Sequence, residues 1–137
     1  MRALLQYCAG GRESKFAAGT QILREGEMTG RVYVLVDGQV DVVKDGTVVA
    51  NLTEPGSILG EMSVLLGRPH SATVIAGTAT TVYAFDDAAT FLASQPGIAL
   101  LVARTLALRL YNATASLADA KRQYAGLRGL VLKMRDQ

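Results

Sequence analysis

The sequence predicts a mainly β fold with helices (α+β), in which an antiparallel sandwich or roll precedes a short helix and a long C-terminal helix. Three observations support this prediction. Short runs rich in β-branched residues, separated by Gly turns, fill the chain from Phe16 to Phe85. After Phe85 the hydrophobic period changes, and Ala, Leu and Arg dominate from Ile98 onward. The chain has 137 residues, half of them hydrophobic, which is enough for one sizeable core.

The turn residues indicate where the strands end. Asp-Gly pairs at positions 37–38 and 45–46 supply the positive φ angles of tight hairpins, so we expect the runs before and after each pair to pair with each other. Pro55-Gly56 forms a further turn. The expected strands cover residues 31–37, 39–44, 47–52, 71–76 and 80–85.

Two helices are expected after the strands. Asp86 is placed to cap a short helix that runs through Ser94, and Pro96 marks the start of the long helix. We therefore assign residues 1–97 to the roll and residues 98–137 to the long helix, as parts of one domain. Charge divides at the same place. Residues 1–97 hold seven basic and ten acidic side chains, a net −3, whereas residues 98–137 hold seven and two, a net +5, which together give +2.

The long helix carries a second pattern. Hydrophobic or small residues recur at alternating steps of three and four, the a and d positions of a two-stranded coiled coil: Leu110, Ala113, Leu117, Ala120, Tyr124, Leu127, Val131 and Met134. In a parallel pairing no g-to-e′ contact joins like charges, so a homodimer through this helix is expected. The alternative is that this stripe packs on the chain's own roll.

The basic residues of the helix are spread around it, which favours a solvated face over a nucleic-acid surface. Residues 124–137 are also too few for a helix-turn-helix domain, so we expect no direct DNA binding from this chain alone.

Scarce residue types exclude several classes of chemistry. The chain has one His, one Cys and no Trp, which excludes a His-rich metal site, a structural zinc site, a Cys-ligated iron–sulfur cluster and an intramolecular disulfide. Cys8 has no plausible base nearby, and no nucleophile–base pair is apparent, so we expect neither an enzyme nor a cofactor. The sequence shows no signal peptide and no apolar run of bilayer-spanning length, so a cytoplasmic protein without membrane association is expected.

Residues 55–74 carry the pattern that points to ligand binding. One short helical turn, Glu61 to Leu66, lies between Gly60 and Gly67. Gly allows a ligand to approach the backbone, and the free N–H groups of a helical first turn favour an anion. Glu61 could accept hydrogen bonds from a sugar hydroxyl. We expect Val64, Leu65 and Leu66 to form the buried side of the turn.

Six motifs in their order make the chain similar to the cyclic nucleotide-binding domain, the sensor module of catabolite activators, of regulatory subunits of cyclic-nucleotide-dependent kinases and of gated channels. The motifs are Phe16-Ala-Ala-Gly19, Ile22-Leu-Arg-Glu-Gly26, Tyr33-Val-Leu-Val-Asp-Gly38, Pro55-Gly56, Leu59-Gly-Glu-Met62 and Arg68-Pro-His-Ser-Ala-Thr-Val74. The resemblance implies an eight-stranded jelly-roll, with a phosphate-binding cassette at residues 56–74.

The resemblance also implies a ligand, cAMP or cGMP, and a set of residues around it. Gly60 and Glu61 would contact the ribose 2′-hydroxyl, Ser71 and Ala72 the cyclic phosphate, and Val34 would lie near the ligand. The full set of expected ligand-binding residues is Tyr33, Gly60, Glu61, Met62, Ser63, His70, Ser71, Ala72, Thr73 and Val74. No catalytic or metal-binding residue is expected.

One residue departs from the family pattern. The usual cassette has Arg immediately before the Ser-Ala or Thr-Ala pair, and this sequence has His70. Arg offers phosphate a permanent charge and a planar fork of donors, whereas neutral imidazole offers one donor. Three interpretations are open: His70 is a weaker phosphate contact helped by Arg68, the pocket has lost nucleotide binding and serves as a dimeric scaffold or interaction module, or His70 serves another ligand, such as haem.

The resemblance suggests how a ligand signal would reach the helix. A ligand shifts a conformational equilibrium only by its differential affinity for the two states. We expect the ligand between the roll and the long helix, a hinge at residues 95–97, and Tyr111 or Asn112 as a lid over the base.

Overall fold

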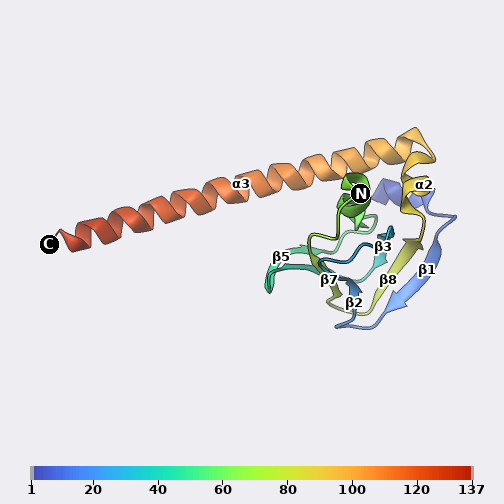
Figure 1. Ribbon diagram of the computed structural model, residues 1–137, viewed down its shortest axis with the longest axis horizontal. Coiled ribbons are helices and arrows are strands. Elements are labelled where there is room, and N and C mark those ends of the chain that lie inside the picture. The colour runs from blue at the N-terminus through green and yellow to red at the C-terminus, as the bar shows by residue number, and fades with distance from the viewer. Residues whose placement is uncertain (1, 137) are drawn as a thin grey trace. The chain divides into compact units, whose positions relative to one another are not determined.

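The computed structural model describes residues 2–136 and consists of two compact units, the first ending at Val102 and the second beginning at Ala103. Each unit is described by itself. The first unit contains all eight strands, which form two four-stranded antiparallel sheets with the orders β1-β8-β3-β6 and β2-β7-β4-β5 (Figure 1). The predicted eight-stranded antiparallel roll, short helix and long C-terminal helix are confirmed.

The elements follow one another in a simple order, with the strands interrupted once by a helix. They are the 3₁₀ helix η1 (Arg2–Tyr7), β1 (Arg12–Phe16), β2 (Gln21–Leu23), β3 (Val32–Asp37), β4 (Val40–Lys44), β5 (Thr47–Leu52), β6 (Ile58–Leu59), α1 (Glu61–Leu66), β7 (Thr73–Ala76), β8 (Thr80–Phe85), α2 (Ala88–Ala93) and α3 (Pro96–Arg135). The short strands β1, β2 and β6 were not expected from the residue pattern.

The core lies between the two sheets. Leu35 and Val82 of the first sheet and Val40 of the second are completely buried within one hydrophobic cluster. Along β8 buried and half-buried residues alternate, as in a strand with one face on a core. The ring of Tyr33 also belongs to this cluster and meets Phe16 edge-on at 6.0 Å between ring centroids. The core thus fixes the strands that carry the expected ligand-binding residues.

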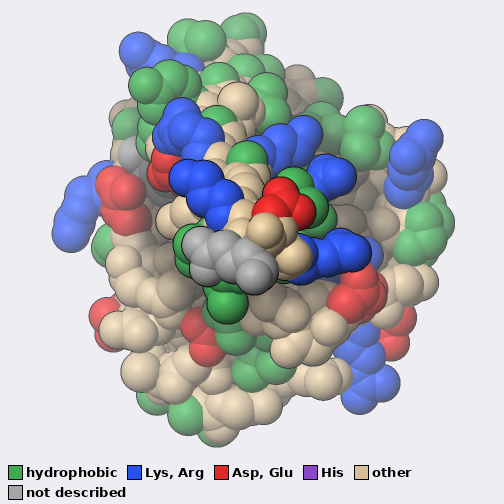
Figure 2. All heavy atoms as spheres, turned by 90° about the vertical axis from the view of Figure 1, so that its left-hand side faces the viewer, with side chains coloured by type: hydrophobic (Ala, Val, Ile, Leu, Met, Phe, Trp, Pro, Cys, Tyr) green, Lys and Arg blue, Asp and Glu red, His purple; other side chains and the backbone are tan. Residues whose placement is uncertain are grey.

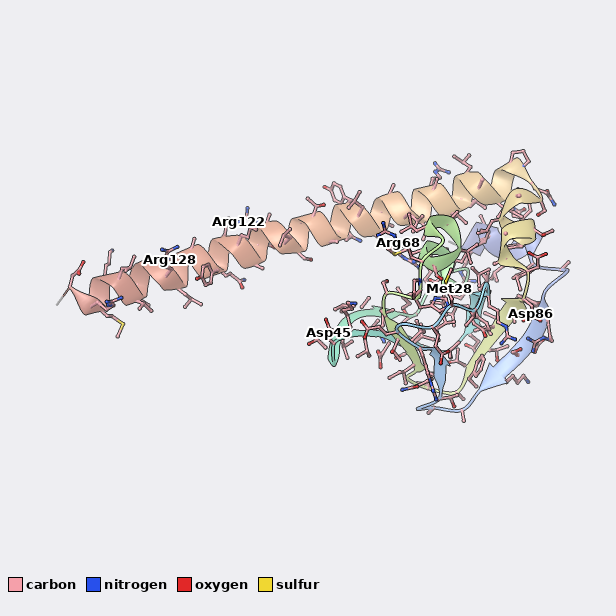
Figure 3. All side chains as sticks on the ribbon, in the orientation of Figure 1. Met28, Asp45, Arg68, Asp86, Arg122 and Arg128 are labelled. Carbon is pink, nitrogen blue, oxygen red and sulfur yellow. The ribbon has the colours of Figure 1, made fainter. Side chains whose placement is uncertain are left out.

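One predicted hairpin is confirmed and the other is wrong. Asp45 (φ 50°) and Gly46 (φ 76°) form the turn between the paired strands β4 and β5, and Asp45 lies at its tip (Figure 3). In contrast, β3 pairs with β6 and β8, whereas β4 pairs with β5 and β7. Gly38 (φ 100°) therefore turns the chain from one sheet to the other. An Asp-Gly pair favours a sharp turn, but it does not determine which strand becomes the partner.

The cap of α2 differs from the prediction by one residue. The Asp87 carboxylate accepts hydrogen bonds from Thr90 N (3.3 Å) and Thr90 Oγ1 (2.7 Å), and these bonds lower the pKa of Asp87. Asp86 instead forms ion pairs with Arg12 (3.3 Å) and Arg31 (3.2 Å). The reason is geometric, since an N-cap carboxylate bonds the amide three residues ahead and α2 begins at Ala88.

The second unit is the continuation of α3 from Ala103 to Arg135. Every large side chain of the predicted a/d seam is more than half exposed, from 53% for Val131 to 68% for Leu110. The basic side chains Arg122 and Arg128 lie on this helix (Figure 3), and Arg122 pairs with Asp119 one turn earlier. Within residues 2–136, no helix has both the length and the apolar character needed to cross a membrane.

Candidate functional site

The helix α1 lies between two left-handed glycines. Gly60 (φ 88°) precedes it and Gly67 (φ 63°) follows it. A Cβ atom at Gly60 would lie 2.9 Å from the carbonyl oxygen of Arg31 and 3.0 Å from Leu23 Cδ1. At Gly67, in contrast, such an atom would meet nothing within 4 Å. Both positions favour Gly for its backbone conformation, but only at Gly60 does close packing add a second reason.

The buried side of α1 is polar, which corrects the expectation that Val64, Leu65 and Leu66 are buried. Glu61 and Ser63 are buried, whereas Leu65 and Leu66 are exposed and Val64 is half-buried. The loop after the helix folds back onto Ser63, because Ser63 Oγ donates to the carbonyl oxygen of Arg68 (2.5 Å) and Arg68 N donates to that of Ser63 (3.1 Å). This loop therefore covers the side of the helix that carries Ser63.

The other expected ligand-binding residues differ in burial. Tyr33 and Val74 lie in the core cluster, on strands of opposite sheets. Ala72 and Thr73 are half-buried, and Met62 and Ser71 are exposed. The structure brings Gly60 close to His70, whose Cε1 atom lies 3.4 Å from the position of a Cβ at Gly60. The start of α1 and the segment before β7 thus meet at one place.

His70 is buried and is bonded to the loop between β2 and β3. Its side chain is only 4% exposed, and no histidine is visible on the face drawn in Figure 2. The ring Nε2 atom lies 2.8 Å from Thr29 Oγ1. The backbone N–H donates to the carbonyl oxygen of Glu27 (2.8 Å), and the carbonyl oxygen accepts from Gly26 N (2.9 Å). Nearby, Glu25 N donates to Thr73 Oγ1 (3.0 Å).

The electrostatics of His70 follow from this burial. Desolvation lowers the pKa of the imidazole below its ordinary value, and the nearby negative charge of Glu27 opposes that shift. Arg68, which could supply a positive charge nearby, follows α1 and is exposed (Figure 3). A fixed cation like that of an Arg is therefore missing at position 70 itself.

Thr29 is the residue of this site that the sequence did not reveal. It lies 41 residues before its partner His70. The sequence between Gly26 and Tyr33 shows no motif that would single out Thr29, because the contact exists only after β2 and β7 pair in one sheet.

A cavity of about 330 Å³ lies between α1 and the start of α2. Its lining includes Met28, Ser63, Val64, Asp86 and Asp87. Of the expected ligand-binding residues it contains only Ser63, so this cavity is separate from the place where Gly60 and His70 meet.

Comparison with known proteins gives a family match over most of the first unit. The family model of the cyclic nucleotide-binding domain matches residues 13–93. Over 101 residues the chain is 36% identical to the cyclic nucleotide-gated potassium channel mll3241 of Mesorhizobium japonicum, a match that covers 72% of this chain and 27% of the channel. Over 75 residues it is 32% identical to the cAMP-dependent protein kinase regulatory subunit of Yarrowia lipolytica, covering 55% of this chain and 20% of that protein.

A solved structure extends this similarity to the fold. The catabolite activator protein of Thermus thermophilus is 25% identical, with a TM-score of 0.69 over 85% of this chain and 58% of that one. The chain spans less than a third of the length of either curated relative.

Proposed function

Because the chain belongs to the cyclic nucleotide-binding domain family, we propose that it is a non-enzymatic sensor domain for cAMP or cGMP. The observation that carries this proposal is the arrangement at the start of α1. The buried carboxylate of Glu61 directly follows Gly60, which has a left-handed backbone and gives the helix no side-chain cap. A buried carboxylate suits a ribose hydroxyl, because it can accept a hydrogen bond from it.

We propose the following roles for the individual residues, which the resemblance to the family implies. Glu61 accepts a hydrogen bond from the ribose 2′-hydroxyl beside the Gly60 backbone. Ser71 and Ala72 present their N–H groups to the cyclic phosphate, next to His70. Side chains that complete the site are Tyr33, Met62, Ser63, Thr73 and Val74, and their burial ranges from core to exposed.

Isothermal titration calorimetry with cAMP and cGMP tests the proposed function directly. We expect saturable binding of one nucleotide per chain, with a matching rise in the thermal unfolding midpoint. AMP is the control for the cyclic phosphate, because it keeps the base and ribose but has an open, doubly ionised phosphate. The absence of both heat and thermal shift at millimolar cAMP and cGMP would contradict the proposal.

One observation favours a second candidate, a domain of this fold that acts as a scaffold or interaction module without a cyclic nucleotide. His70 replaces a fixed cation with a buried ring that already bonds Thr29. Calorimetry separates this candidate from the first, because a scaffold gives no heat with either nucleotide.

We propose that occupancy is transmitted through the start of α3. The hinge assigned to residues 95–97 coincides with the junction between α2 and α3. Gly97 packs so closely on η1 that a Cβ there would overlap the hydroxyl of Tyr7. A ligand that favours one orientation of this junction would shift its equilibrium by the difference in its affinity for the two states.

We further propose that the second unit forms a parallel homodimeric coiled coil through its a/d seam. The variant Leu127→Glu, which changes a d position, is expected to convert the dimer to a monomer. A charge buried at the seam is unpaired and costs about 3 kcal/mol. Sedimentation velocity at tens of micromolar measures the outcome.

Leu132→Glu is the matched control for the coiled coil. Leu132 lies on the same helix at a b position and is 49% exposed, compared with 63% for Leu127. This variant is expected to remain dimeric. A monomeric wild-type chain, or equal effects of the two variants, would refute dimerisation through this seam.

A further inference from the structure

His70 is the only histidine in the 137 residues and stands beside the expected position of the cyclic phosphate. We propose that His70 couples ligand binding to the uptake of a proton, so that the pocket takes an anionic cyclic phosphate together with one H⁺ on the imidazole. This inference rests on the proposed function. With this proton, His70 is the residue that favours an anionic ligand over a neutral one.

The position of the His70 imidazole is the first observation that supports the proposal. Residue 70 directly precedes Ser71 and Ala72, and its Cε1 atom lies 3.4 Å from the place that a Cβ of Gly60 would occupy. The imidazole therefore lies where the start of α1 and the segment before β7 meet. Nε2 is bonded to Thr29 Oγ1, whereas Nδ1 has no hydrogen-bond partner among the described residues. Nδ1–H is a donor for a ligand oxygen in the imidazolium and in the neutral tautomer whose Nε2 accepts from Thr29, and only the imidazolium adds a positive charge.

Thr29 allows the ring to exist in both protonation states. A hydroxyl group has one donor and two acceptor sites and rotates to suit its partner. Thr29 Oγ1 already accepts from Arg31 N at 3.2 Å, which leaves one lone pair and the O–H for His70. The hydroxyl can donate to Nε2 of the neutral ring, or accept from Nε2–H of the imidazolium. Gain of a proton thus breaks no hydrogen bond around His70.

The charged groups near His70 lie on the β2–β3 loop, on α1 and in the loop after α1. On the β2–β3 loop, Glu27 faces His70 and also pairs with Arg24 (3.9 Å), and Glu25 pairs with Lys44 (2.5 Å). On α1, the buried Glu61 follows Gly60. The remaining cations nearby are engaged or exposed, since Arg31 pairs with Asp86 and Arg68 lies in solvent.

Burial keeps the pKa of the free ring below its ordinary value despite Glu27. A cyclic phosphodiester is an anion throughout the range where His titrates, and a bound anion raises the pKa of an adjacent imidazole. At a pH between the pKa of His70 in the free protein and its pKa in the complex, the complex holds one more proton than the free protein. The affinity for a cyclic nucleotide therefore rises as the pH falls through this window, with a limit of about tenfold per pH unit.

The lone histidine makes the test direct. Two-dimensional ¹H–¹⁵N NMR of the imidazole gives its pKa without cAMP and with saturating cAMP, and only one ring contributes signals. Calorimetry at pH 6 and 8, in buffers of different ionisation enthalpy, counts the protons taken up. We expect a higher ring pKa in the complex, proton uptake, and tighter cAMP binding at pH 6 than at pH 8. Adenosine, which lacks the phosphate, is expected to bind without proton uptake.

Two variants separate this coupling from the proposed function itself. His70→Arg carries a permanent charge and is expected to bind cAMP about tenfold or more tightly at pH 8 than the wild type does, with no proton uptake. His70→Gln keeps a hydrogen-bonding side chain that cannot be protonated, and is expected to show weak, pH-independent binding. A cooperative thermal unfolding transition in each variant confirms that the variant is folded.

Wild-type binding of cAMP without proton uptake would overturn the coupling and leave the sensor function intact. The coupling is also overturned if adenosine binds as tightly as cAMP at pH 6, or if only His70→Arg binds cAMP. If neither the wild type nor His70→Arg binds a cyclic nucleotide, the proposed function fails, and the coupling fails with it.

Discussion

Replacing Gly60 with Ala is expected to lower the free energy of unfolding by about 2–5 kcal/mol. The backbone at this position is left-handed (φ 88°), which costs an L-residue roughly 1–2 kcal/mol. The added methyl group would also lie 2.9 Å from the carbonyl oxygen of Arg31, an atom of the backbone. Displacing it costs about another 1–3 kcal/mol, the usual range for overpacking. Urea denaturation followed by circular dichroism measures the change.

Gly67→Ala is the matched control at the other end of α1. Gly67 is also left-handed (φ 63°), but a Cβ there meets nothing within 4 Å. Only the conformational cost remains, about 1–2 kcal/mol. The difference between the two variants therefore reports the packing of Gly60 against β2 and the Arg31 backbone. Equal losses of stability in the two variants would show that this packing contributes nothing.

The glycines illustrate how much of this site the sequence alone predicts. Gly60 and Gly67 bracket a short helix as expected, because a residue of positive φ at each end is a local property that Gly encodes directly. The Asp45-Gly46 turn between β4 and β5 was predicted for the same reason. The pairing of β3 is different, since it depends on which distant strand completes the sheet.

The environment of His70 could not be predicted, for a related reason. Its position before Ser71 follows from the motif, but its burial and its bond to Thr29 require the β2–β3 loop to fold over it. The same holds for α1, where the apolar residues 64–66 were expected inside and the polar residues Glu61 and Ser63 are buried instead. A six-residue helix has too few turns for its hydrophobic pattern to decide which face is buried.

Replacing Glu61 with Gln is expected to weaken cAMP binding by about 5- to 13-fold. A hydrogen bond to a charged group contributes roughly 1.5–3 kcal/mol and a neutral one roughly 0.5–1.5 kcal/mol, and Gln keeps a neutral acceptor of the same shape, so about 1–1.5 kcal/mol is lost. Glu61 is only 3% exposed, so water cannot easily replace the lost interaction. Calorimetric titration of the two proteins with cAMP, under identical conditions, gives the ratio of dissociation constants.

A double cycle with 2′-deoxy-cAMP distinguishes a ribose contact from a general weakening of the site. If Glu61 accepts from the 2′-hydroxyl, the wild type binds the deoxy ligand about 10- to 150-fold more weakly than cAMP, whereas Glu61→Gln discriminates the two ligands several-fold less. Each ratio is measured within one protein, so any loss of stability in the variant cancels. Equal discrimination by the two proteins would contradict the contact, because the carboxylate would then act on the fold of α1 rather than on the ribose.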